Sequence, residues 1–106
     1  MICRIWRGWT TLENADAYQH IVHTEVIPEI EARSIPGLRR IDLMKRVIAH
    51  EVEFQTQMWF DNLEAVTVFM GEDYARSHVP PRARAVLKRF DENASHFDVI
   101  DRRAQS

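Results

Sequence analysis

The stretch Val52-Glu53-Phe54-Gln55-Thr56-Gln57-Met58-Trp59-Phe60 alternates polar residues with residues that are mostly large and apolar. Successive side chains of a strand point to opposite faces of a sheet, so this alternation predicts a strand with one apolar face turned to a core. Trp59 falls among the polar residues on the other face. Both faces of this strand therefore carry large apolar surface that needs a cover.

Three further segments show a strand pattern. Leu38–Val47 alternates just before the first stretch, and the short connection over residues 48–51 predicts a hairpin between the two. Ile2–Trp9 and Ser95–Ile100 are expected to form the first and last strands. The first strand would carry Ile2, Arg4, Trp6 and Gly8 on one face, and Cys3, Ile5, Arg7 and Trp9 on the other.

A helix is expected after the first strand. Thr10 and Glu13 resemble a capping box, and apolar residues then recur at helical spacing over residues 15–30. Pro28 lies inside this pattern, where it frees the carbonyl of Thr24 and should kink the last turn.

A second helix is expected after the third strand. Asp61 and Glu64 form another apparent capping box, and Gly71 suits the C-terminal end of the helix that follows. Pro80-Pro81 fits the first turn of a further short helix.

Strand, helix, strand, strand, helix, strand is the ferredoxin-like order. It predicts an α+β fold in which a four-stranded antiparallel sheet carries its helices on one face. The 106 residues suffice for one such domain, which we assign to residues 1–100, followed by a polar C-terminal tail at residues 101–106. Because both faces of the first and third strands are partly apolar, we expect a homodimer that covers the face without helices.

The composition excludes several classes of function. Lys and Arg number 14 against 16 Asp and Glu, a balance that argues against nucleic-acid binding. Cys3 is the only cysteine, so no internal disulfide can form and a reducing compartment is favoured. We find neither a signal peptide nor an apolar run of about 18 residues, so we expect a cytoplasmic protein without a membrane segment.

Three parts of the chain resemble the antibiotic biosynthesis monooxygenase-like family of the dimeric α/β-barrel superfamily. They are the opening Met1-Ile2-Cys3-Arg4-Ile5-Trp6-Arg7-Gly8, the run Gln57-Met58-Trp59-Phe60-Asp61 before a helix, and the closing Ser95-His96-Phe97-Asp98-Val99. The resemblance spans nearly the whole chain. It implies a dimeric α/β barrel and a small aromatic or quinone-like substrate, oxidised without a metal, a flavin or any other cofactor.

Such chemistry needs a base, a cationic group and an apolar pocket for the ring. His78 and His96 are the candidate bases, and Arg4 and Arg7 are the candidates for stabilising a phenolate. The expected pocket walls are Trp6, Trp59 and Tyr74.

Two alternatives remain at the level of sequence. One is a ligand-binding or structural dimer that kept the fold without the chemistry. The other is a haem-binding or haem-degrading protein, because relatives of that kind have a Trp at the position of Trp59 and use a later His, for which His78 is the candidate. Those enzymes also have an Asn on the first strand, and this chain has none there.

Two other features have simpler interpretations. His20 and His23 are three residues apart on a helix, but no other metal-ligating motif accompanies them, so we expect a solvent-facing pair and no metal site. Cys3 lies mid-strand among apolar residues and is expected to be a buried core residue rather than a nucleophile.

Overall fold

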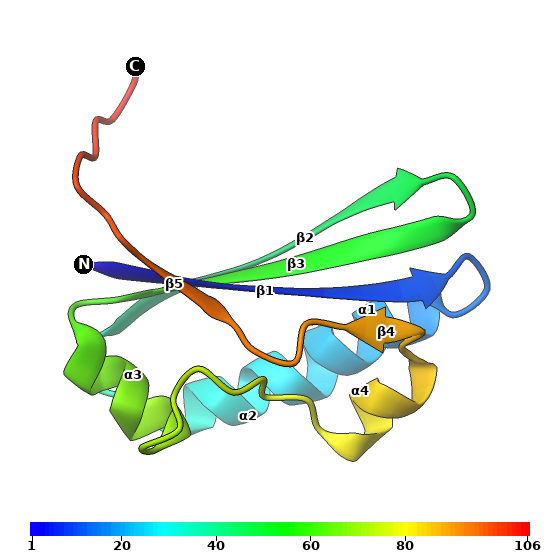
Figure 1. Cartoon of the computed structure of the whole chain (residues 1–106), viewed down its shortest axis with the longest axis horizontal. Coiled ribbons are helices and arrows are strands. Elements are labelled where there is room, and N and C mark those ends of the chain that lie inside the picture. Colours follow the sequence, from blue (N-terminus) through cyan, green and yellow to red (C-terminus); the bar gives the residue numbers. More distant parts are fainter.

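The computed structural model describes residues 1–106 and has one antiparallel sheet with all its helices on one side (Figure 1). The strands are β1 (Ile2–Thr11), β2 (Leu38–Ile48), β3 (Glu51–Phe60), β4 (Arg89–Phe90) and β5 (Ser95–Asp98). The helical segments are α1 (Ala15–Ile21), the π-helix η1 (Val22–Val26), α2 (Ile27–Ala32), α3 (Leu63–Met70) and α4 (Pro81–Val86). The strand order is β2-β3-β1-β4, with β5 also paired to β1. The predicted ferredoxin-like α+β fold is confirmed.

The last strand of the predicted order is divided into β4 and β5, which pair with different parts of β1. The chain leaves the sheet between them because it binds the segment before α4. Ser77 N–H donates to the Glu92 carbonyl at 3.0 Å, and Ala94 N–H donates to the Ala75 carbonyl at 2.7 Å. These bonds fasten residues 71–80, which lie between α3 and α4, to the edge of the sheet.

The register of the strands decides which sheet face the helices cover. Arg4 lies opposite Met58, and Trp6 lies opposite Thr56, so these four residues share the helix-covered face. The opposite face has no helix over it (Figure 1). We call it the open face; its members include Cys3, Ile5, Arg7, Trp9, Arg40, Met44, Glu53, Gln55, Gln57, Trp59 and Phe97.

The open face keeps large apolar side chains in contact with solvent, as the mixed strand pattern predicts. Met44 is 43% exposed and Phe97 is 55% exposed, while Trp59 is half-buried. Cys3 is buried, as expected.

Both predicted capping boxes are wrong. Thr10 is fully buried inside β1, which continues to Thr11, and α1 begins only after Asn14. At α3 the cap is Asn62, whose Oδ1 accepts a hydrogen bond from the Ala65 N–H at 3.0 Å. At the first box the strand continues past the predicted end at Trp9, and at the second the Asp61 carboxylate binds Arg39.

The helix irregularity lies before Pro28 and is a widened turn. Over η1 the backbone is a π-helix, and the Ile27 N–H donates to the Val22 carbonyl five residues back. Pro28 has no N–H with which to complete the α-helical bond to the Thr24 carbonyl. We attribute the wider turn to this missing donor, where the sequence predicted a kink.

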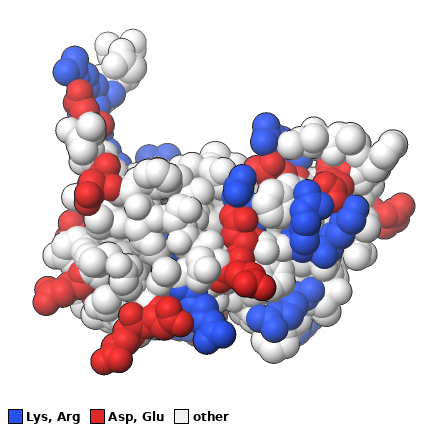
Figure 2. Space-filling model, in the orientation of Figure 1, with Lys and Arg blue, Asp and Glu red and all other residues white.

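Charged side chains of both signs are interspersed on the surface (Figure 2). Many are paired: Glu51 binds both Lys88 and Arg89, and Arg82 binds Glu25 at 2.5 Å. None of the helices has the length and apolar character needed to cross a bilayer.

Candidate functional site

A cavity of about 50 Å³ lies between the helix-covered face of the sheet and the helical run α1-η1-α2. It forms where two core clusters meet, one around Tyr18 and Phe54 and the other around Phe60 and Phe69. Eleven of its 15 lining residues are hydrophobic. The few polar groups in the lining, which include Arg4, Tyr18 and His78, would therefore orient any bound molecule.

Arg4 is a buried cation at the wall of this cavity, with only 3% of its surface exposed. Its Nη1 donates to the Tyr74 carbonyl at 2.5 Å, and its Nη2 donates to the Arg76 carbonyl at 2.6 Å. No carboxylate pairs with it, and burial lowers the pKa of its guanidinium to about 10. Buried charges are normally paired, so Arg4 lacks an anion that a ligand could supply.

His96 accepts a hydrogen bond from Arg4. Its Nε2 lies 3.0 Å from Arg4 Nη1, and because arginine can only donate, this nitrogen is the acceptor. Tyr74 packs edge-on against the His96 ring at 5.2 Å between centroids. Neither ring lines the cavity. His96 and Tyr74, predicted as a base and a pocket wall, therefore lie beside Arg4 and position it.

His78 lines the cavity, and its imidazole nitrogen Nε2 is buried and has no hydrogen-bond partner. The Glu29 carboxylate lies 4.0 Å from this atom. Burial, together with the positive charges of Arg33 and Arg4, lowers the pKa of His78 below its ordinary value. The ring is therefore neutral at pH 7 and has a lone pair that can accept a proton.

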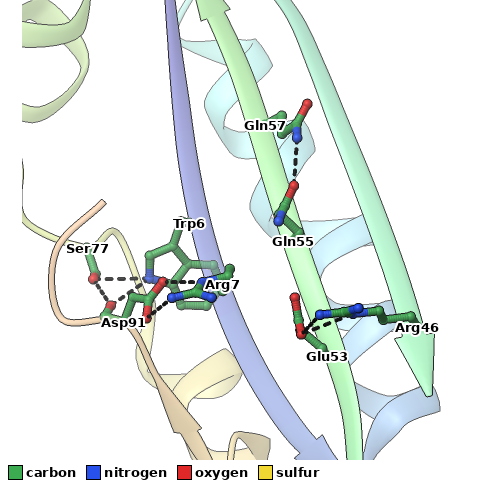
Figure 3. Close-up of polar contacts among 8 residues, drawn as sticks. All are labelled: Trp6, Arg7, Arg46, Glu53, Gln55, Gln57, Ser77 and Asp91. Atoms are coloured by element: carbon green, nitrogen blue, oxygen red, sulfur yellow. Dashed lines mark hydrogen bonds and ion pairs between the residues drawn. The ribbon is translucent and has the colours of Figure 1, made fainter. Parts of the chain in front are cut away.

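Trp6 lines the cavity. Its Nε1 donates to the Asp91 carbonyl at 2.8 Å and contacts Ser77 Oγ at 3.1 Å (Figure 3). Its ring lies across Gly8, where a Cβ atom would come within 2.7 Å of the indole. The absence of a side chain at Gly8 therefore allows this ring orientation.

Arg7 and Trp59 lie on the other side of the sheet. Arg7 is exposed and binds the Asp91 carboxylate at 3.0 Å (Figure 3). Trp59 stacks under the Arg40 guanidinium, 5.2 Å from the ring centroid. Since both belong to the open face, neither can line the same cavity as Arg4 and Trp6.

Comparison with known proteins links this architecture to two solved structures. A protein from Bacillus cereus, described as a proposed antibiotic biosynthesis monooxygenase, superposes with a TM-score of 0.70 at 10% identity, over 99% of this chain and 96% of that one. Rv0793 from Mycobacterium tuberculosis superposes with a TM-score of 0.59 at 16% identity, over 97% and 98% of the two chains. No family model and no curated protein matches the sequence.

The chain has the fold of these two proteins. The family resemblance seen in the sequence is thereby confirmed at the level of the fold. In this fold, the cavity lies between the sheet and the helices, on the side of the sheet opposite the open face.

The sequence did not single out Tyr18 and η1 as parts of the site. Tyr18 is 3% exposed and lines the cavity, and Val22 and Val26 of η1 line it too. A signal for Tyr18 was present, since it is the one polar side chain in the apolar stripe of the first helix. Pro28 was the only residue in the sequence that indicated the π-helix. Such π-turns are frequent at functional sites.

The residues fit a haem poorly. The haem alternative pairs Trp59 with His78, but these side chains lie on opposite faces of the sheet. The cavity of about 50 Å³ is also far smaller than a pocket for a macrocycle.

Beyond one wall of the cavity lies a surface groove of about 720 Å³ between the helical run and residues 77–84. Val26, His78, Val79 and Pro80 line both spaces. Residues 78–80 belong to no helix or strand. The cavity and the groove therefore adjoin along these four residues.

The two histidines beside Arg4 make stability depend on pH. Burial, aided by Arg4, lowers the pKa of both His78 and His96. The unfolded chain therefore takes up protons that the native state resists, so the stabilisation is complete above about pH 6.5 and is lost as the pH falls. We expect the free energy of unfolding to decrease between pH 7 and pH 5, by at most about 1.4 kcal/mol per pH unit for each histidine.

Urea denaturation across this pH range measures the slope. The double variant His78→Gln with His96→Gln should flatten it, whereas His23→Gln, at an exposed position, should leave it unchanged. An equal slope in the double variant and the native chain would contradict this assignment.

Proposed function

We propose that the protein is a cofactor-independent, monooxygenase-like enzyme that oxidises a small aromatic or quinone-like compound bound as an anion in the internal cavity. The observation that carries the proposal is Arg4, a buried cation without a carboxylate partner at the wall of an apolar cavity. The fold shared with a proposed antibiotic biosynthesis monooxygenase supports the reaction class.

Arg4 retains donors for such an anion. A guanidinium has five N–H groups, and those of Arg4 meet Tyr74, Arg76 and His96. Two N–H groups, one on Nε and one on Nη2, are left for a phenolate or enolate oxygen. Fixed donors aimed at developing negative charge in a dry site stabilise it by several kcal/mol (order of magnitude).

His78 is the proposed base. Its neutral Nε2 would take a proton from a C–H next to the aromatic system, and the Glu29 carboxylate 4.0 Å away would stabilise the imidazolium formed. The resulting carbanion, held by Arg4, reacts with dioxygen. A ring CH2 group loses both hydrogens, one oxygen atom becomes the carbonyl, and the other leaves as water. The substrate itself supplies the electrons.

Ligand access requires movement of the residues that line both the cavity and the groove. At about 50 Å³ the cavity is below the ~300 Å³ of typical ligand pockets, and the groove beyond Val26, His78, Val79 and Pro80 provides the missing space. We propose that the ring enters from the groove and displaces residues 78–80. The proposed base would then lie at the junction of cavity and groove.

Oxygen uptake with anthrones tests the proposal. The native chain should accelerate uptake, and His78→Gln should lower kcat by about 100-fold, the lower range for loss of a general base. The rate should rise with pH as His78 loses its proton, with a midpoint below about pH 6.5 because the pKa of His78 is lowered. His23→Gln is the matched control at an exposed position. Full activity in His78→Gln would remove the base from this role.

A non-catalytic ligand-binding protein of the same fold is the second candidate. The small volume of the cavity favours it, because the chain as it stands has no open space for substrate and oxygen together. Binding of aromatic anions, together with no oxygen uptake from any anthrone tested, would favour this alternative.

We also propose that the open face binds a second copy of the chain. Bare apolar groups on the open face, among them Met44 and Phe97, support this partner. The cavity lies on the other side of the sheet, so a partner on the open face would stabilise the sheet without contributing side chains to the site.

A further inference from the structure

Tyr18 is a buried residue whose hydroxyl has no role in the proposed chemistry. The residue is 3% exposed, its side chain lines the cavity, and its ring packs on Phe54 with 4.7 Å between centroids. Burial is the only cause that raises its pKa, and no hydrogen bond from the chain reaches the phenol. Buried tyrosines usually have a partner for the hydroxyl. Because Tyr18 lines the cavity, a ligand bound there can supply this partner.

Tyr18 and Arg4 adjoin different parts of the sheet. Arg4 is opposite Met58, whereas the ring under Tyr18 belongs to Phe54, which is opposite Gly8. The four steps along β1 from Arg4 to Gly8 correspond to about 13 Å of strand at ~3.3 Å per residue. Trp6 and Thr56 lie between these two positions in the sheet and also line the cavity.

We infer that the ligand is an elongated aromatic anion that carries a hydrogen-bond acceptor, a carbonyl or ether oxygen, at the end away from the anion, and that the Tyr18 hydroxyl donates to it. This inference rests on the proposed function, because it takes Arg4 as the partner of the anionic end.

The selectivity follows from desolvation of the hydroxyl. When an aromatic ligand fills the cavity, any water beside Tyr18 is displaced, and a ligand without an acceptor leaves the O–H unpaired. An unsatisfied buried donor costs more than a hydrogen bond gains, so matched ligands with and without the oxygen should differ by about 10-fold in Kd. Tyr18 is then a specificity-determining residue rather than a catalytic one.

Two ligands of the same shape make the test. The first is 6-acetyl-2-naphthoate, which has a carbonyl opposite its carboxylate, and the second is 6-isopropenyl-2-naphthoate, which has a CH2 group in place of that oxygen. Calorimetry on the native chain should give the acetyl ligand a Kd about 10-fold lower. In Tyr18→Phe the two ligands should bind equally, mainly because the isopropenyl ligand gains affinity relative to the acetyl ligand.

Thr56→Val is the matched control, since Thr56 is a second hydroxyl in the lining, and it should keep the 10-fold ratio. Tyr18→Phe should melt at an unchanged or higher temperature, because the hydroxyl bonds to nothing in the chain. A marked decrease in its melting temperature would reveal a structural partner and overturn the inference.

The remaining outcomes separate this inference from the proposed function. Equal affinities in the native chain, or a ratio that survives Tyr18→Phe or disappears in Thr56→Val, overturn the role of Tyr18 and leave Arg4 as the anion site. If neither naphthoate binds the native chain, the proposed aromatic-anion site is refuted and the inference with it.

Discussion

Arg4→Met is expected to lower the affinity for 2-naphthoate by about 100-fold and to change the affinity for uncharged 2-naphthamide only slightly. Methionine has a similar length but neither the charge nor the N–H groups. Two charge-assisted hydrogen bonds at about 1.5 kcal/mol or more each correspond to that loss. Titration calorimetry with both ligands measures the difference, and the neutral ligand reports whether the cavity itself survives.

Arg7→Met is the matched control, because Arg7 lies three residues further along the same strand on the open face. It should bind both ligands as the native chain does. Arg4→Lys keeps the charge without the planar fork and should bind 2-naphthoate with an intermediate Kd.

Stability must be measured beside affinity, since Arg4 also holds the carbonyls of Tyr74 and Arg76. Leaving these acceptors unpaired should lower the free energy of unfolding by roughly 2–4 kcal/mol, partly offset by the removal of a buried, uncompensated charge. If Arg4→Met does not fold, Arg4→Lys carries the test. A folded Arg4 variant that binds 2-naphthoate like the native chain would contradict the role of this residue.

Most of the strand order was predictable because alternation identifies strands that have one buried face. The choice between Arg4 and Arg7 also follows from alternation, since residues three apart on a strand lie on opposite faces. By the same rule, Trp6 and Trp59 lie on opposite faces of the sheet and do not share one pocket. Trp59 lies beside Glu53, Gln55 and Gln57 in the strand pattern, so it belongs to the face without helices.

The environment of Arg4 could not be predicted from local patterns. It depends on residues 71–80, which lie about 70 positions away and present backbone carbonyls rather than a recognisable side-chain motif. The two capping boxes also failed because of contacts far away in the sequence. At the second box, the Asp61 carboxylate binds Arg39 on β2. Pairing with β3 keeps Thr10 and Thr11 in the sheet, and this gain exceeds the stabilisation of about 1 kcal/mol that a cap provides.

The second large effect is expected on the oligomeric state. The native chain should have twice its chain mass of 12.5 kDa at tens of micromolar, and Trp59→Lys should reduce the mass to that of one chain. With ten residues each in β1 and β3, the open face of a four-stranded sheet covers roughly 600 Å², near the ~800 Å² per partner of a standard interface. Lysine at position 59 would lie beside Arg40, which stacks on the Trp59 ring, and two such pairs would face each other in a dimer.

Light scattering coupled to gel filtration measures the mass. Val68→Lys is the control, since Val68 is 63% exposed on α3, on the helical side of the sheet, and it should leave the mass unchanged. The monomeric Trp59→Lys variant should still bind 2-naphthoate, because the cavity lies on the side of the sheet opposite the open face. A native mass of 12.5 kDa would refute the dimer, and loss of naphthoate binding in a folded Trp59→Lys monomer would mean that the partner copy shapes the cavity after all.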